Sequence, residues 1–405
     1  MKKRIFLTVL FLLLVLAYFA YQPMLPTPFA WNDLPKITAK KKSIVNKDNI
    51  WISPITNAQD LLIDWQKKLN APSLSMAIGH QGEVLWSEAV GYADIESQTL
   101  ADEQTIYRIG SISKSVTSVA LATLFDKGIL SPDDQMSQLL PDYELNNSAI
   151  SIKQLASHTA GIRHYGLCFC LPIMAEGFNS KIYTDVKDAV NIFGKDELLF
   201  TPGEGFRYST YGFTLLSAAI QEVSQQPFLE YLQKAVLNPI GMKSTKAGGT
   251  VTPIAKKASF YDVEENQFKP IYPTNISNKW AGGGLLSTPT DLVKMGNALQ
   301  DSSFISPMAK ANLFTPIPLK DGTMNPQRYG MGWRIGTDIQ SFSPKEVKVI
   351  HHGGTIGGGI ALIIMFPEYD LTVSMMTNRS GSSGELFQPI FETAKPFIEA
   401  IEKTK

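Results

Sequence analysis

The stretch Ser111-Ile112-Ser113-Lys114 places a serine and a lysine three residues apart, where a strand-like segment gives way to a helix. Residues three apart lie on one face of an α-helix, so we expect the Lys114 amine within reach of the Ser111 hydroxyl. A serine hydroxyl is a weak nucleophile until a base takes its proton, and a lysine is such a base only if burial or a neighbouring cation keeps its amine neutral. The motif therefore predicts a helix that begins at a semi-buried cleft with Ser111 as an activated nucleophile. A single S-x-x-K is common by chance, so the interpretation depends on supporting residues elsewhere.

The bulk composition is that of a globular protein. The chain has 405 residues, of which 44% are apolar, and this is ample for a buried core. Lysine plus arginine and aspartate plus glutamate number 37 each, so no overall electric field attracts nucleic acid. We therefore expect no nucleic-acid partner. The sequence indicates no oligomeric state.

The N-terminus has the features of an export segment. Lys2, Lys3 and Arg4 precede a run of 17 residues, Ile5 to Tyr21, that is apolar except for Thr8. This run exceeds the roughly 7–15 apolar residues of a removable signal peptide and approaches the ~20 that span a bilayer. We favour an uncleaved anchor in a bacterial inner membrane, with the rest of the chain in the periplasm; a cleaved signal peptide, giving a secreted protein, is the alternative. A mitochondrial presequence would be amphipathic and rich in Arg and Ser, which this segment is not.

The chain is expected to have three parts. Residues 1–21 form the anchor or signal peptide, residues 22–57 form a tether rich in proline and lysine, and residues 58–405 form the folded domain. The tether lysines are interpreted as a solvated spacer in preference to a lipid-binding patch.

The folded domain is expected to combine an antiparallel sheet with helices. A helix at 58–69 precedes a hairpin of strands 73–79 and 83–91, and the C-terminal part supplies strands at 347–351, 360–366 and 371–377 and a helix at 385–402. Helices are predicted between these parts at 113–127, 152–157, 211–223, 227–236 and 289–299. The periodicities therefore predict a sheet built from both ends of the domain, with a helical lobe inserted between them.

Tyr208 is a second group able to share the Ser111 proton. It opens the stretch Tyr208-Ser209-Thr210, which follows a turn at residues 202–205. A nearby ammonium favours the phenolate and burial favours the free amine, so Ser111, Lys114 and Tyr208 are expected to act as a coupled unit. Standing alone, Tyr208 would be interpreted as a core tyrosine.

His351-His352-Gly353-Gly354 ends a strand-like run and opens a glycine-rich turn through Gly359. Glycine lets backbone approach a substrate closely. This strand edge is a candidate for pairing with an extended substrate, and the amides of Ser111 and Gly354 are candidates for binding a developing oxyanion. A tight bend between strands needs glycine equally, so both interpretations stay open.

The two cysteines, Cys168 and Cys170, are too close in sequence for an ordinary unstrained disulfide. Together with His158 and His164 they offer potential zinc ligands, but the spacing matches no common zinc pattern. The favoured interpretation is a pair of free thiols in a loop beside the cleft.

Taken together and in this order, these motifs resemble those of the serine β-lactamase and penicillin-binding-protein superfamily, in its class C-like, peptidase S12-type branch. Ser111 to Lys114 matches S-x-x-K, Tyr208 to Thr210 stands where Y-x-N is usual, and His351 to Gly353 stands where K-T-G or H-x-G is usual. Within that superfamily the chain resembles mitochondrial serine β-lactamase-like proteins and their bacterial relatives more closely, through residues 157–165, 279–288 and 329–333. The resemblance extends from Ala58 to the C-terminus.

The resemblance implies a mixed α/β (α+β) fold, an antiparallel sheet flanked by helices with an inserted helical lobe, in agreement with the elements predicted above. It implies Ser111 as the acylated nucleophile and Lys114 and Tyr208 as proton shuttles. The residues implied to contact substrate or oxyanion are His351, His352, Gly353, Gly354 and Thr210. It implies no metal or organic cofactor. It implies that the partner of the protein is a peptide or small acyl substrate.

Two departures from the family pattern bear on substrate choice. Thr210 replaces the usual asparagine and so lacks an amide that both donates and accepts, which puts antibiotic hydrolysis in doubt. His351 replaces a permanent lysine charge with a group largely neutral at pH 7, so a substrate carboxylate would be held weakly. We prefer His351 for this position, with His352 as the alternative register. His158 and His164 are interpreted as loop-packing residues because the proton chemistry is already supplied.

The leading hypothesis is a membrane-tethered serine hydrolase that cleaves an amide bond in a peptide through an acyl-enzyme on Ser111. Esterase or β-lactamase-type activity on small acyl compounds is the second, because the same machinery attacks esters more easily. A non-catalytic penicillin-binding or sensor module is the third, and the intact Ser111, Lys114 and Tyr208 disfavour it.

Overall fold

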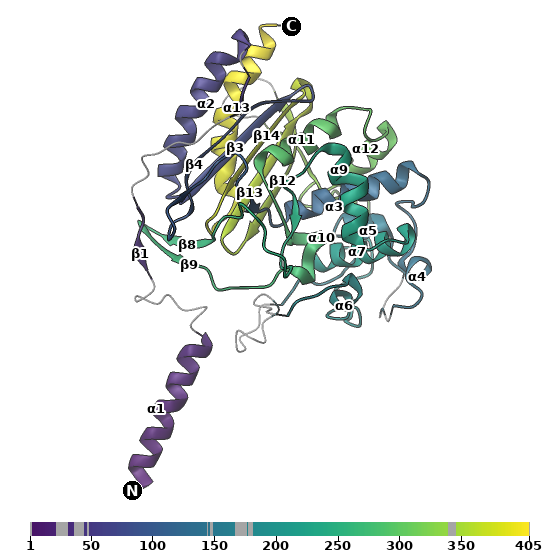
Figure 1. The fold of residues 1–405 in the computed structure, drawn as a ribbon. Coiled ribbons are helices and arrows are strands. Elements are labelled where there is room, and N and C mark those ends of the chain that lie inside the picture. Colours follow the sequence, from purple (N-terminus) through teal and green to yellow (C-terminus); the bar gives the residue numbers. More distant parts are fainter. Residues whose placement is uncertain are drawn as a thin grey trace.

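The computed structural model describes residues 2–21, 31–35, 44–46, 48–143, 145, 149–166, 176, 181–338 and 346–404 (Figure 1). Its centre is an antiparallel sheet in the order β11-β12-β13-β14-β3-β4-β2, with β5 paired to β4. The strands are β2 (Ile44–Val45), β3 (Ser73–His80), β4 (Glu83–Asp94), β5 (Thr99–Leu100), β11 (Arg334–Asp338), β12 (Val347–Ile356), β13 (Gly359–Phe366) and β14 (Leu371–Thr377). The central pairing of β14 with β3 joins the C-terminal strands to the N-terminal hairpin, as the sequence predicted.

Two terminal helices, α2 (Asn49–Lys68) and α13 (Phe387–Glu402), lie side by side on one face of this sheet (Figure 1). The buried positions of α2 follow the helical repeat Trp51, Ile55, Ala58, Leu62 and Trp65. The predicted start at residue 58 is nine residues too late, because Pro54 inside the first turns conceals the helical pattern. The last residues assigned to the tether therefore form part of the packed domain.

On the other face, α11 (Pro289–Gln300) packs against β3 and β14 and leads to the helical lobe (Figure 1). Thr288 caps α11 by accepting a hydrogen bond from the Asp291 N–H. The lobe contains α3 (Ile112–Asp126), α5 (Ile152–Ala156), α6 (Val186–Val190), α7 (Thr210–Ser224), α8 (Phe228–Leu232), α10 (Trp280–Gly283) and α12 (Pro307–Phe314). The mixed α/β fold with a helical lobe is therefore confirmed.

Local differences from the predicted elements have local causes. The predicted helix 227–236 is α8 followed by a π-helical stretch, Gln233–Leu237. Strand β12 runs through its glycines to Ile356, because Gly353 and Gly354 stay in register with Leu362 and Ala361 of β13. The turn lies at Gly357 and Gly358 instead.

Two small sheets were not predicted, since strands of two to four residues carry too little alternation to detect. One contains β1 (Asn32–Asp33), β8 (Tyr261–Glu264) and β9 (Gln267–Pro270). The other contains β6 (Tyr107–Arg108), β7 (Lys246–Ala247) and β10 (Leu285–Ser287). The second sheet matters for the site, because β6 leads directly into the turn before Ser111.

The N-terminal segment is helix α1 (Lys2–Tyr21), whose large apolar side chains from Ile5 to Tyr18 are mostly exposed. Among the residues that the structure describes, no helix combines the length and the hydropathy needed to cross a membrane.

Candidate active site

Ser111 stands at the N-terminus of α3, directly after a turn that admits only glycine. Gly110 has φ of +50°, and a Cβ at this position would lie 2.9 Å from the Thr355 backbone nitrogen. Ser111 itself is half-buried, and within the described residues its N–H meets no acceptor. The turn therefore presents both the hydroxyl and a free backbone donor at the start of a helix, where the helix dipole favours negative charge.

Lys114 lies one helical turn further and is completely buried. Its Nζ is 3.3 Å from Ser111 Oγ and 3.1 Å from Thr210 Oγ1, and it donates to the Gly282 carbonyl oxygen. A neutral amine has two N–H donors and one lone pair. If Gly282 and Thr210 accept the two donors, the lone pair is left for the Ser111 hydroxyl proton.

The surroundings of Lys114 favour that neutral amine. Burial lowers its pKa well below the ordinary lysine value, and the charges of Arg334 and Lys279 lower it further. In the described part of the chain no carboxylate forms an ion pair with Lys114. The S-x-x-K motif requires a lysine that can act as a base. Burial and the charges of Arg334 and Lys279 together favour the neutral amine that this role needs.

Tyr208 and Thr210 approach the same point from the start of α7. The Tyr208 phenol is half-buried and hydrogen-bonded to Ser111 and Arg334. Burial raises its pKa above the ordinary tyrosine value, although Arg334 and the Ser111 hydrogen bond oppose this effect. The Lys114 Nζ lies 4.7 Å from the centroid of the Tyr208 ring. Ser111, Lys114, Tyr208 and Thr210 therefore meet in one cluster, in which burial favours the neutral forms of the phenol and of the amine.

His158 and His164 hold the backbone that carries Tyr208. The Ser209 N–H donates to His158 Nδ1 at 3.2 Å, and the Thr210 N–H donates to His164 Nδ1 at 3.0 Å. Burial lowers the pKa of His158 well below its ordinary value and lowers the pKa of His164 to about 3. Both rings are thus neutral acceptors, with a positioning role that goes beyond the loop packing predicted for them.

The two neighbouring histidines of β12 point to opposite faces of the sheet. His352 is fully buried, and its ring lies 6.4 Å from that of Tyr208. His351 packs edge-on against Phe387 of α13 at 5.0 Å, and its Nδ1 has no hydrogen-bond partner among the residues that the structure describes. The structure brings His352, and not His351, to the cluster, so the preferred register of the sequence analysis does not fit this geometry and its alternative does.

The tautomer of His352 follows from its partners. Arg334 Nη1 lies 3.3 Å from His352 Nε2 and can only donate, so Nε2 is an acceptor. The Tyr329 hydroxyl is 2.8 Å from the same Nε2, and Nδ1 lies 2.7 Å from the Gly353 carbonyl oxygen, to which it donates. Burial keeps the pKa of His352 well below its ordinary value. His352 is therefore a neutral ring that orients Arg334.

Gly354 allows β12 to touch the start of α3. A Cβ on Gly354 would lie 1.8 Å from the Ile109 carbonyl oxygen and 3.2 Å from the Ser111 nitrogen. The ladder with β11 ends at the pair Arg334 and His351, so the β12 edge beyond His351 has no partner on that side within the described residues. Gly353 faces away from the cluster, because its Cβ would meet Ser383 Oγ at 2.3 Å.

Three contributors were not predicted as site residues. Gly282 supplies a carbonyl to Lys114, Lys279 supplies charge from the residue before α10, and Arg334 supplies charge and donors from the start of β11. Lys279 lies in a stretch that carried the family resemblance, and Arg334 lies directly beside one. Neither stands at a sequence spacing from Ser111 that would mark it as a catalytic residue.

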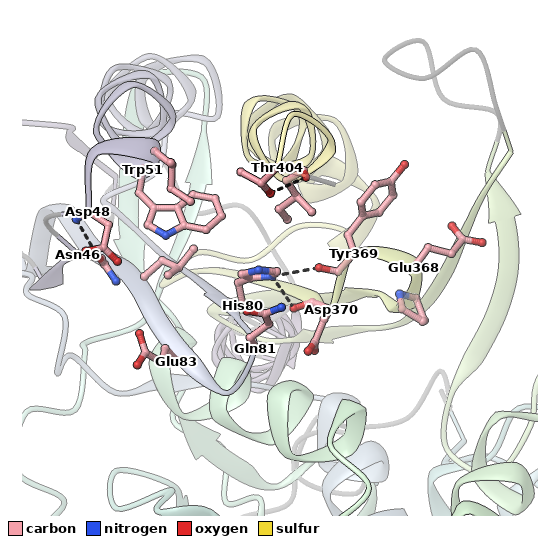
Figure 2. A pocket seen from close by; sticks show the side chains of 14 residues that line it. Asn46, Asp48, Trp51, His80, Gln81, Glu83, Glu368, Tyr369, Asp370 and Thr404 are labelled. Carbon is pink, nitrogen blue, oxygen red and sulfur yellow. Dashed lines mark hydrogen bonds between the residues drawn. The ribbon is translucent and has the colours of Figure 1, made fainter.

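A cavity of about 690 Å³ lies elsewhere, between α2, the β3–β4 turn, the turn before β14 and the end of α13 (Figure 2). Its lining includes Trp51, His80 and Asp370, and His80 Nδ1 lies 3.0 Å from the Tyr369 carbonyl oxygen. None of the residues of the Ser111 cluster lines it, so the candidate active site rests on the chemistry at Ser111 and not on this cavity. The predicted thiols Cys168 and Cys170 lie outside the described residues, and within those residues no cluster of metal-binding side chains is found.

Comparisons with known proteins point to one family and one fold. The model of the family described as Beta-lactamase matches residues 59–392. The human mitochondrial serine beta-lactamase-like protein LACTB is 28% identical over 398 residues, covering 78% of this chain and 73% of that protein. Penicillin-binding protein 4* of Bacillus subtilis (strain 168) is 24% identical, covering 78% of this chain and 70% of that protein. The D-amino acid amidase of Ochrobactrum anthropi SV3 superposes with a TM-score of 0.69 at 21% identity, over 87% of this chain and 100% of that one.

Proposed function

The chain belongs to the Beta-lactamase family and is a serine hydrolase by family, and we propose that it hydrolyses amide bonds of peptides through an acyl-enzyme on Ser111. The observation that carries the proposal is the fully buried Lys114 amine, 3.3 Å from Ser111 Oγ. A neutral amine at hydrogen-bonding distance from a serine is the arrangement that general-base activation of a nucleophile requires.

In the acylation step, Lys114 Nζ accepts the Ser111 proton while Oγ attacks the scissile carbonyl carbon. The carbonyl oxygen becomes an oxyanion, which the Ser111 N–H and a backbone N–H of β12 near Gly354 are positioned to bind. The C–N bond then breaks, and the leaving amine takes a proton from the Tyr208 phenol. Lys114 returns its extra proton to the Tyr208 oxygen, and the ester on Ser111 remains.

In the deacylation step, water attacks the ester carbonyl, and its proton passes to Tyr208 while the Tyr208 proton passes to the neutral Lys114 amine. The Ser111 oxygen leaves and takes a proton back, so one water is consumed and one carboxylic acid and one amine are released. Arg334 assists because its hydrogen bond and charge stabilise a transient Tyr208 phenolate.

The test is steady-state hydrolysis of a panel of peptide amides, with D-amino acid amides first because one structural relative is named a D-amino acid amidase. Ser111→Ala should lower kcat/KM by at least roughly a thousandfold, because it removes the nucleophile. Ser303→Ala, at an exposed serine outside the cluster, is the matched control and should keep full activity. Undiminished hydrolysis by purified Ser111→Ala would contradict the mechanism.

Two alternatives use the same residues. Esters and β-lactams also react with an activated serine, so activity on them is expected and does not by itself identify the natural substrate. A binding module without turnover would form a Ser111 adduct that does not hydrolyse. Thr210 favours peptide or simple amide substrates over β-lactams, because its hydroxyl is occupied by Lys114 and supplies no amide for the substrate.

We further propose that the N-terminal segment attaches the protein to a membrane, with the catalytic domain outside the cytoplasm of a bacterial cell. The exposed apolar side chains of α1 and the basic residues before them support this proposal. Extraction of the full-length protein from membranes only by detergent would support it, and release by alkaline carbonate alone would contradict it.

A further inference from the structure

Arg108 is a buried cation whose charge meets no acid. It lies on β6 and is only 8% exposed. Its Nη1 donates to the Gly357 carbonyl oxygen at 2.8 Å, its Nη2 donates to the Thr274 carbonyl oxygen at 3.4 Å, and its guanidinium carbon lies 4.6 Å from the centroid of the Phe260 ring. No carboxylate forms an ion pair with Arg108 among the described residues. Burying a charge without a counter-charge is costly, so its retention indicates a use for the charge.

The Arg108 guanidinium keeps hydrogen-bond donors that the protein does not use. An arginine side chain has five N–H donors, and the two carbonyl oxygens take two of those of Arg108. The other N–H donors of this side chain have no acceptor in the part of the chain that the structure describes. Burial lowers the pKa of Arg108 to about 10, which still leaves the side chain charged at neutral pH. Charge and donors are therefore both available to an anion that the chain itself does not supply.

Arg108 lines a cavity of about 190 Å³ that adjoins β6 and β10. A cavity of this volume holds several water molecules and hence a small anion. Among the described residues that line it there is no aspartate or glutamate. The polar side chains of the lining are a second cation and three threonine hydroxyls, in addition to Arg108: Lys257, Thr250, Thr252 and Thr274. The polar side chains around the cavity can therefore all donate hydrogen bonds, and none is negative.

A glycine-containing loop brings backbone donors to the same cavity. Gly249 has φ of +73°, and a Cβ at this position would lie 2.5 Å from Asn275 Oδ1, so the loop passes this close to Asn275 only with glycine. The N–H groups of Gly249, Thr250 and Thr252 have no acceptor within the described ranges. Neighbouring backbone N–H groups in a turn commonly form a concave site for an anion.

The cavity is separate from the Ser111 cluster. None of the side chains that approach Ser111 lines it. The two sites are nevertheless neighbours along the chain, because β6 leads from Arg108 directly into the turn at Gly110. The hydrogen bond from Arg108 to Gly357 also holds the turn between β12 and β13. A group bound at Arg108 would therefore brace the elements that carry the cluster without touching the nucleophile.

We propose that this cavity binds a phosphate group, free or carried by a small molecule, between Arg108 and Lys257. A phosphate has acceptor oxygens in several directions, which suits donors that come from β6, from the loop at 249–252 and from Thr274, whereas a carboxylate has two oxygens in one plane. Arginine binds phosphate through paired N–H donors, and lysine binds it as a point charge. The proposal does not depend on the hydrolase function, because it concerns a different cavity.

The test is isothermal titration calorimetry of the full-length protein in detergent at pH 7.5, with chloride holding the ionic strength constant. Three probes distinguish the sources of the phosphate group. Orthophosphate represents the free ion, glycerol 3-phosphate a phosphorylated small molecule, and glycerophosphoglycerol the headgroup of an anionic phospholipid. At least one probe should bind with a dissociation constant at or below about 1 mM, the affinity that two or three charge-assisted hydrogen bonds provide. The probe that binds most tightly identifies the source.

Two substitutions test the cations that hold the phosphate. Arg108→Gln should weaken binding by roughly tenfold or more, because it removes a buried charge-assisted contact. Lys257→Met should weaken it by about threefold, since this side chain is exposed and screened. The matched control is Lys256→Met, because the adjacent Lys256 is also exposed but donates to Gln104 Oε1 at 2.6 Å, lies 3.5 Å from Asp102 and does not line the cavity. This control should keep the wild-type dissociation constant.

A third substitution tests the cavity without changing its charge. Thr274→Val removes a hydroxyl of the lining but keeps the carbonyl oxygen that accepts from Arg108, and it should weaken binding by roughly threefold. Thermal unfolding curves identify any variant that does not fold, and Lys257→Met with Thr274→Val completes the test if Arg108→Gln is such a variant.

Three results would overturn the phosphate proposal. The first is a wild-type dissociation constant above about 10 mM for every probe. The second is unchanged binding in folded Arg108→Gln, or in both Lys257→Met and Thr274→Val. The third is an equal loss in Lys257→Met and Lys256→Met, which would mean that the probes respond to the general surface charge and not to this cavity.

Discussion

Acidification should destabilise this protein strongly at a pH where its carboxylates are still ionised. Burial lowers the pKa of His158 and His352 well below their ordinary values and lowers the pKa of His351 to about 3. In the unfolded chain each of these rings titrates near pH 6.5. Below that pH the unfolded state binds more protons than the folded state, so stability is present above pH 6.5 and is lost as the pH falls.

The magnitude follows from proton linkage. Between pH 7.5 and pH 5.5 an unfolded histidine gains a proton that the folded one refuses, which costs about 1.4 kcal/mol per ring. Three such rings give about 4 kcal/mol, and His164, which is half-buried and better screened, adds less. This is a large part of the roughly 5–15 kcal/mol that stabilises a typical domain.

The assay is urea unfolding followed by tryptophan fluorescence at pH 7.5, 6.5 and 5.5. His351→Phe removes one of the rings at a site where the ring packs on Phe387 and where Nδ1 has no partner in the described part of the chain, so the pH-dependent loss should shrink by about 1.4 kcal/mol. Phe387→Leu disturbs the same contact without removing a titrating group and should lower stability equally at every pH. A wild-type loss below about 1 kcal/mol between pH 7.5 and 5.5, or an unchanged slope in His351→Phe, would refute the reasoning.

Three further predictions concern the reactivity of Ser111 toward a fluorophosphonate. Gly354→Ala should abolish labelling or folding, because its Cβ would overlap a carbonyl oxygen at 1.8 Å. The control Gly336→Ala, where the nearest atom would be 3.6 Å away, should label normally. Equal labelling rates in the two variants would contradict the close approach of β12 to the start of α3. The labelling rate should be flat from pH 7 to pH 9, because burial holds the pKa of Lys114 well below its ordinary value. A rate that rises tenfold per pH unit across this range would mean that the Lys114 amine is protonated at neutral pH. Thr210→Val should slow labelling by roughly tenfold, because the Lys114 amine loses a hydrogen-bond acceptor. Thr210→Ser should restore the rate. Equal labelling rates in the two variants would remove Thr210 from the mechanism.

The sequence predicted the core of the site because its spacing is local. Ser111 and Lys114 share a helix face by the three-residue rule, and the start of α7 follows a recognisable turn at residues 202–205. The hairpin β3–β4 and the strands β13 and β14 were predicted for the same reason, since alternation and turn residues are short-range signals.

The charge of the site was not predictable in the same way. Arg334 and Lys279 come near the cluster only through tertiary packing, and neither stands at a sequence spacing from Ser111 that would mark it as part of the site. The choice between His351 and His352 depends on the parity of a strand, because a shift of one residue exchanges the faces of the sheet. Similarly, the start of α2 is set by packing of Trp51 against Phe397, with ring centroids 5.9 Å apart, and not by helix propensity.

The central claim is that Ser111 is an activated nucleophile, and intact-protein mass spectrometry of the full chain after exposure to a fluorophosphonate tests it most directly. The account predicts a single adduct that peptide mapping assigns to Ser111 and that Ser111→Ala does not form. A parallel exposure to a penicillin shows whether the site also accepts a β-lactam. An unlabelled wild-type protein, or an adduct that persists in Ser111→Ala, would contradict the account.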